Sequence, residues 1–151
     1  MNRVGLIGYG YWGKILEPNI KRVFDSEVVI HDPMCGILNE NNIDKCEHVF
    51  VATPAGTHYE IVKSLLIRGK KVFCEKPLCL SKKEVEDLYY NSVLNTKSSL
   101  FVDWVFTYND AVNFIKDSYE NGIYGKLRSA SMNRLNSGPE RKDVSAKWDL
   151  A

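Results

Sequence analysis

Glu75 and Lys76 are the side chains in this sequence that most suggest chemistry, because they directly follow a predicted buried strand over residues 71–74. Pro77 comes next and predicts a sharp turn. In open α/β sheets, ligands bind beyond the carboxyl ends of the strands, so a carboxylate and an ammonium group here could bind or transform a ligand. The alternative is a strand that leaves the core through a solvated Glu-Lys pair.

A glycine-rich turn near the amino terminus predicts a dinucleotide site. Residues 3–7 form a short apolar strand, and Gly8, Gly10 and Gly13 then give G-x-G-x-x-G before a helical pattern that runs to about residue 24. Gly8 would allow the tight turn, Gly10 the close approach of a pyrophosphate, and Gly13 the packing of helix against strand. Strand, turn and helix together favour a nucleotide site over an ordinary turn.

Two further features fit a bound dinucleotide. The backbone N–H groups of Tyr11 and Trp12 open the helix, where the helix dipole favours phosphate. Asp32 ends a second predicted strand, 27–31, about 20 residues after the glycines, where an acid can accept hydrogen bonds from a ribose diol. A carboxylate there would repel a 2′-phosphate, so we expect NAD rather than NADP, and a CoA- or phosphate-binding protein is disfavoured. The alternative is that Asp32 only opens an Asp-Pro turn with Pro33.

The rest of the chain alternates strands and helices, which predicts an α/β fold with a doubly wound parallel sheet, the Rossmann type. Ala111, Phe114, Ile115 and Tyr119 are expected to face the core from the last helix. The further strands are expected at residues 49–52, 71–74 and 100–105, and the further helices at 57–68, from the capping box at 81–84 onward, and at 109–121 before Gly122.

Composition and charge argue against several classes of protein. Hydrophobic residues make up 44% and charged residues 26% of the 151 residues, with a net charge of +1, as in ordinary globular proteins. No basic cluster with interleaved aromatics suggests nucleic acid, and no apolar run suggests a membrane span. A strand begins within three residues of Met1, so we expect no signal peptide. Four cysteines without a C-x-x-C pair suggest reduced thiols in the cytoplasm, and the histidines lack the spacing of a zinc site.

Two motifs together resemble the Gfo/Idh/MocA oxidoreductases, the relatives of glucose–fructose oxidoreductase and inositol dehydrogenase. They are Ala-Thr-Pro-x-x-x-His over residues 52–58 and Gly-Lys-Lys-Val-Phe-Cys-Glu-Lys-Pro-Leu over 69–78, and the resemblance covers essentially the whole chain. It implies an NAD-dependent dehydrogenase acting on a sugar or nucleotide-sugar, and a homo-oligomeric full-length protein.

The same resemblance suggests roles for single residues. It places Lys76 beside the nicotinamide, where it would stabilise an alkoxide or relay its proton, and makes Pro77 the proline, often cis, that fixes this turn. Thr53 and Pro54 would line the cofactor crevice. Glu75 would tune Lys76 or merely solvate the turn, and we expect His58 to serve packing rather than catalysis.

Near the carboxyl terminus, Asp149 matches the aspartate of the family's Asp-x-x-x-His pattern, whose histidine would act as general acid or base. That histidine would come after Ala151, so we expect a dinucleotide-binding domain over residues 1–122 and a truncated second domain over 123–151, inactive on its own. Residues 128–135 alternate like one strand of that second domain. The competing interpretation is a non-catalytic NAD-binding sensor or partner subunit.

Overall fold

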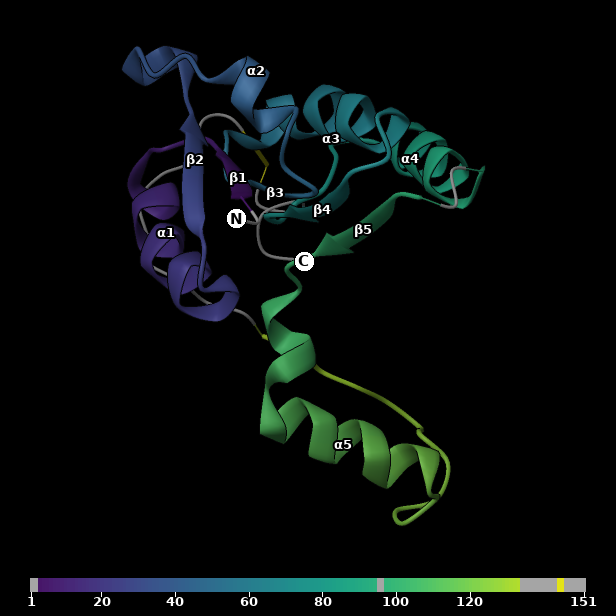
Figure 1. The fold of residues 1–151 in the computed structure, drawn as a ribbon. Coiled ribbons are helices and arrows are strands. Elements are labelled where there is room, and N and C mark those ends of the chain that lie inside the picture. The colour runs from purple at the N-terminus through teal and green to yellow at the C-terminus, as the bar shows by residue number, and fades with distance from the viewer. Residues whose placement is uncertain (1–2, 95–96, 134–143, 146–151) are drawn as a thin grey trace.

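The computed structural model describes residues 3–94, 97–133 and 144–145. Its centre is one parallel five-stranded sheet in the order β2-β1-β3-β4-β5, which confirms the predicted doubly wound α/β class (Figure 1). The strands are β1 (Arg3–Ile7), β2 (Glu27–His31), β3 (His48–Val51), β4 (Lys71–Cys74) and β5 (Ser99–Val102).

Helices cover the two faces of the sheet unequally. On one face, α1 packs through Ile20 against Val4, Leu6 and Val28 of the strands. On the other face, α2, α3 and α4 share one larger core with β3 and β4, in which Leu65 and Leu88 are fully buried. The helices are α1 (Tyr11–Phe24), α2 (Glu40–Ile43), α3 (His58–Ile67), α4 (Lys82–Leu94) and α5 (Asp110–Glu120), and the 3-10 turns are η1 (Pro33–Cys35), η2 (Ala55–Thr57) and η3 (Val105–Tyr108).

Local capping explains where several helices begin. Ser81 and Glu84 form the predicted capping box before α4: the Glu84 N–H donates to Ser81 Oγ at 3.2 Å, and the Ser81 N–H donates to Glu84 Oε2 at 3.1 Å. The Asn109 side chain accepts from the Val112 N–H at 3.1 Å and caps α5. Strand β5 ends at Val102 rather than at 105, because the chain after Trp104 turns into η3.

The last helix and the residues after it differ from the sequence-based predictions. Phe114, Ile115 and Tyr119 were predicted to face a core, but their exposed fractions are 62%, 67% and 57%, since α5 extends away from the sheet (Figure 1). Residues 128–133 form no strand, because none of the described residues pairs with them. Residues 134 and 135 of that predicted strand lie outside the described residues.

Candidate active site

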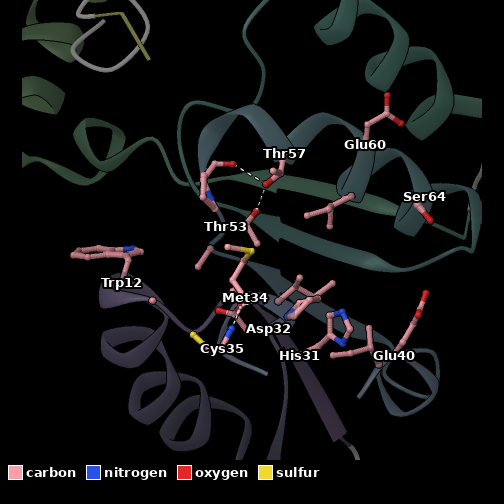
Figure 2. Close-up of a pocket in the computed structure, with 18 of the residues that line it drawn as sticks. Trp12, His31, Asp32, Met34, Cys35, Glu40, Thr53, Thr57, Glu60 and Ser64 are labelled. Carbon is pink, nitrogen blue, oxygen red and sulfur yellow. Dashed lines mark hydrogen bonds between the residues drawn. The ribbon is translucent and has the colours of Figure 1, made fainter. Parts of the chain in front are cut away.

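A large crevice opens at the carboxyl ends of the strands, where the strand order reverses. The chain passes from β1 to β2 on one side and then crosses to β3 on the other, which creates the gap in which such folds bind ligands. A cavity of about 1110 Å³ occupies this place (Figure 2). Residues predicted for the site line it from the segments that follow β1, β2 and β3: Gly8, Gly10, Tyr11, Trp12, Asp32, Thr53 and Pro54.

Each of the three motif positions is glycine for a different reason. A Cβ at Gly13 would lie 2.1 Å from the carbonyl oxygen of Gly8, and one at Gly8, which has a φ of +93°, would lie 2.7 Å from the backbone of Ala52. The fold itself therefore requires both. Gly10 has a φ of −71°, and a Cβ there would meet nothing within 4 Å. Because Gly10 lines the cavity, its missing side chain leaves space for a ligand rather than for the protein.

The first turn of α1 borders the same space. Gly10 is the N-cap residue and provides no side chain to accept hydrogen bonds from the first N–H groups of α1. No acidic side chain lies in that first turn. The helix dipole and the N–H groups of Tyr11 and Trp12 thus provide a partial positive charge at the cavity, suited to a phosphate group.

Asp32 is almost entirely buried at the end of β2, with an exposed fraction of 8%. Its Oδ2 accepts the Tyr9 N–H at 2.6 Å, and its Oδ1 accepts the N–H groups of Met34 at 2.9 Å and Cys35 at 3.2 Å. The hydrogen bond from Tyr9 is the main cause that holds the pKa of Asp32 below its ordinary value. Asp32 is therefore an ionised acceptor in the cavity wall, and it also caps the Asp-Pro turn that was its alternative role.

His58 connects the two motifs of the family resemblance. Its ring is 1% exposed, and its Nε2 and Nδ1 lie 2.8 Å from the carbonyl oxygens of Thr53 and Pro77, respectively. His58 is thus a structural residue, as expected, because its buried ring contacts both the turn after β3 and the turn after β4. Thr57 adds to the first turn by donating to the Pro54 carbonyl at 2.7 Å (Figure 2).

The predicted chemistry-bearing turn follows β4 directly. Glu75 and Lys76 are half-buried and Pro77 is buried, and the Lys76–Pro77 peptide bond is cis, as the resemblance suggested. Glu75 accepts a hydrogen bond from the Trp12 indole of the glycine-rich turn. Burial is the main cause that raises the pKa of Glu75. None of the three residues lines the 1110 Å³ cavity itself, and Trp12 is the side chain that joins it to this turn.

The sequence did not predict the part of the cavity that lies along α3 and after β2. Thr57, Ile61, Ser64 and Arg68 line it from α3 and its two cap residues, at helical spacings of four, three and four. Their spacing is the signal in the sequence that could have identified this wall of the cavity. The other lining residues that were not predicted include Glu60 of the same helix and His31, Pro33, Met34, Cys35, Glu40 and Ile43. Asp149 lies outside the described residues. The described residues contain no group of three potential metal ligands.

Curated relatives match this chain over a part of their own length. An uncharacterised oxidoreductase of Streptococcus pneumoniae is 24% identical over 98% of this chain and 44% of its own. The 2,7-anhydro-N-acetylneuraminate hydratase of Escherichia coli is 24% identical over 98% and 43%. The myo-inositol 2-dehydrogenase of Thermotoga maritima is 28% identical over 82% and 42%. This chain therefore spans less than half the length of these relatives.

Solved structures share the fold. The scyllo-inositol dehydrogenase of Lactobacillus casei, solved with NAD(H) and scyllo-inositol, has a TM-score of 0.62 at 22% identity and covers 83% of this chain and 42% of its own. A 3-ketoreductase of Actinomadura kijaniata, solved with NADP and TDP-benzene, has a TM-score of 0.60 at 21% identity over 84% and 46%. At these identities the likeness establishes the fold alone.

The family model described as "Oxidoreductase family, NAD-binding Rossmann fold" matches residues 18–97, just over half of the chain. This stretch contains Asp32, the turn after β3 and the turn after β4. The chain therefore belongs to the Gfo/Idh/MocA family of oxidoreductases and comprises its NAD-binding Rossmann fold.

Proposed function

We propose that this chain binds NAD(H) in the crevice and serves an oxidoreductase that transfers hydride between the nicotinamide and a hydroxyl or ketone of a sugar or nucleotide-sugar. The relatives include inositol dehydrogenases, and one solved structure that shares the fold is a 3-ketoreductase in complex with TDP-benzene, which supports a polyol or sugar-like substrate. A hydratase among them means that family membership does not fix net oxidation as the reaction. Hydride transfer must therefore be measured directly.

The observation that carries this proposal is that Gly10 and Asp32 line the same cavity. Gly10 leaves open space beside the first N–H groups of α1, which would hold the pyrophosphate. Asp32 is ionised, and its three backbone hydrogen bonds leave acceptor capacity for a ribose hydroxyl. Thr53 and Pro54 would flank the nicotinamide half, and Ile61 and Met34 offer apolar surface for the adenine.

We assign the reacting end to the turn after β4. The cofactor, when bound, supplies or accepts the hydride. Lys76 would donate a hydrogen bond to the substrate oxygen and stabilise its negative charge as the hydroxyl proton passes to the histidine of the family's Asp-x-x-x-His pattern, which would act as general base. Glu75 and Pro77 would position Lys76 from either side. Asp149 would act at the same place, paired with the histidine of the family pattern.

Calorimetric titration with NAD and NADP tests the binding proposal. We expect NAD to bind more tightly, because Asp32 would repel a 2′-phosphate and Pro33, Met34 and Cys35 after it offer no positive charge. Tighter binding of NADP would overturn the choice of cofactor, and no binding of either would overturn the proposal.

A variant at Lys76 separates an enzyme from a sensor. In a hydride-transfer assay of the full-length protein with polyols and nucleotide-sugars, Lys76→Ala should lower kcat by about 10²–10⁴-fold while the Kd for NAD changes little, because the lysine acts on the transition state. Equal losses in both quantities would instead make Lys76 a contact of the cofactor's phosphates or ribose.

A further inference from the structure

The end of β2 directs two consecutive side chains to opposite faces of the sheet. Asp32 accepts the Tyr9 N–H on the α1 side, and His31 lies in the cavity wall that α2 and α3 share. The strand pattern agrees, because Val29, two residues before His31, belongs to the core under α2 and α3, whereas Ile30 packs on the α1 side. A base attached to a ribose at Asp32 can therefore reach His31 and this wall.

A backbone hydrogen bond fixes which ring nitrogen of His31 carries the proton. The Asn39 N–H donates to His31 Nδ1 at 3.1 Å, so Nδ1 is an acceptor and the proton of the neutral ring is on Nε2. The Asn39 side chain also donates to the Ile30 carbonyl at 2.8 Å, which holds the residues before α2 against the end of β2. Among the described residues, Nε2 has no hydrogen-bond partner, so His31 offers an N–H donor at the cavity wall.

A carboxylate lies beside this donor. Glu40 opens α2 and lines the same cavity as His31, and both residues also line a smaller pocket of about 330 Å³. Figure 2 shows the two side chains at the same end of the cavity, away from Trp12. In the part of the chain that the structure describes, the Glu40 carboxylate has no hydrogen-bond or ion-pair partner. A free acceptor thus accompanies the free donor.

A donor next to an acceptor, with apolar surface around them, matches one edge of adenine. On that edge a ring nitrogen accepts a hydrogen bond and the adjacent 6-amino group donates one. Ile43 and Ile61 line the same cavity and offer apolar surface on which a purine ring can pack. Hypoxanthine and guanine carry a carbonyl oxygen in place of the 6-amino group, and a carboxylate would repel that oxygen.

We propose that His31 and Glu40 select adenine as the base of the cofactor. His31 Nε2–H donates to the ring nitrogen, and the Glu40 carboxylate accepts from the adjacent 6-amino group. This inference rests on the proposed function, because it requires the adenosine half of NAD(H) in this cavity. It adds a selection that Asp32 does not make, since the ribose diol is the same whichever base it carries. A site built to hydrogen-bond one ligand rejects an analogue that leaves its polar groups unpaired.

Calorimetric titration of the chain with NAD and with nicotinamide hypoxanthine dinucleotide tests the selection. The two ligands differ only in the base, where an oxygen replaces the 6-amino group. We expect the hypoxanthine analogue to bind at least about tenfold more weakly, since the Glu40 carboxylate would face a carbonyl oxygen. Equal affinities would overturn this inference and leave the proposed function intact. No binding of either ligand would overturn both.

Two variants assign the preference to the named side chains. Glu40→Gln exchanges the carboxylate for an amide that can donate to the hypoxanthine oxygen, so the preference for NAD should shrink to about threefold or less. His31→Asn keeps an oxygen that can accept the Asn39 N–H but lacks the Nε2 donor, so NAD affinity should fall about 3–10-fold. Glu86→Gln on α4 is the matched control, because it removes the same charge from a residue that does not line the cavity.

Circular dichroism checks that each variant is folded, and the comparison of the two ligands on the parent chain needs no variant. An unchanged preference in Glu40→Gln would overturn the proposal. So would a preference that is lost in Glu60→Gln of α3 instead, because the selecting carboxylate would then lie on the other helix. Parental NAD affinity in His31→Asn would show that the ring donates nothing to the base and would overturn it as well.

Discussion

The indole Nε1–H of Trp12 donates a hydrogen bond to the carboxylate of Glu75, which is 63 residues away in the sequence. This bond links the glycine-rich turn after β1 to the turn after β4 that carries Lys76. The two parts of the crevice that the motifs identified separately are thus joined by one side-chain contact. Burial, with a smaller contribution from Asp103, raises the pKa of Glu75, and the bond from Trp12 opposes that rise.

The first prediction concerns the charge of Glu75. If Lys76 lies beside the nicotinamide, an ionised Glu75 favours the cationic ring of NAD⁺ over the neutral ring of NADH. The preference for NAD⁺ should therefore weaken as the pH falls through the raised pKa of Glu75. In Trp12→Phe the pKa rises further, so the same loss should occur at higher pH.

Titration with both redox forms across a pH series measures this effect. Glu75→Gln serves as the control, since it should remove the pH dependence of the NAD⁺/NADH ratio while the ribose and pyrophosphate contacts remain. An unchanged pH profile in Trp12→Phe would show that the indole does not tune this carboxylate.

The second prediction separates a ligand glycine from two structural ones. Gly10→Val should lower NAD affinity by at least about 100-fold, or about 2.7 kcal/mol, because its side chain would fill the space for the pyrophosphate. Its free energy of unfolding should change by no more than about 1 kcal/mol, the cost of a poor N-cap residue. Gly13→Ala should instead destabilise the fold, since its Cβ would lie 2.1 Å from the Gly8 carbonyl oxygen.

Calorimetry and urea denaturation of both variants provide the two measurements. If Gly10→Val bound NAD with near-parental affinity, the glycine motif would be only a structural turn. If Gly13→Ala kept the parental free energy of unfolding, the argument from the close contact with Gly8 would be wrong.

Local chemistry explains which elements could be predicted from sequence. The capping box at Ser81 and Glu84 and the glycine turn at Gly8 are each specified by neighbouring residues, so their positions were predicted correctly. The pairing of Trp12 with Glu75 depends on β1 and β4 lying on either side of β3 in the sheet, and no local pattern encodes it. Helix α5 shows a second limit of sequence-based prediction. Its amphipathic pattern predicts a buried apolar face, but that face is exposed among the described residues.

The third prediction concerns His58 as the tie between the turns after β3 and β4. His58→Ala removes a ring whose N–H donates to the Thr53 or the Pro77 carbonyl, depending on the tautomer, and opens a cavity, which should cost about 2–4 kcal/mol. NAD affinity should fall as well, since Thr53 lines the crevice. His48→Ala is the control: it loses a ring contact with Phe24 at 5.2 Å and should cost about 0.5–1.5 kcal/mol. Similar losses of stability in the two variants would argue against the bridge.

The last prediction follows from the lowered pKa of Asp32, whose ordinary value is 3.8. Because the folded state binds this proton less readily than the unfolded state, the ionised carboxylate stabilises the fold above pH 4, and this contribution is lost as the pH falls through the depressed pKa. The difference in free energy of unfolding between the parent chain and Asp32→Asn should be constant above about pH 5 and shrink below about pH 4. Urea denaturation at a series of pH values measures it, and the subtraction removes the other carboxylates. A difference that grows as the solution becomes more acidic would mean that the hydrogen bonds from Tyr9, Met34 and Cys35 do not favour the charged form.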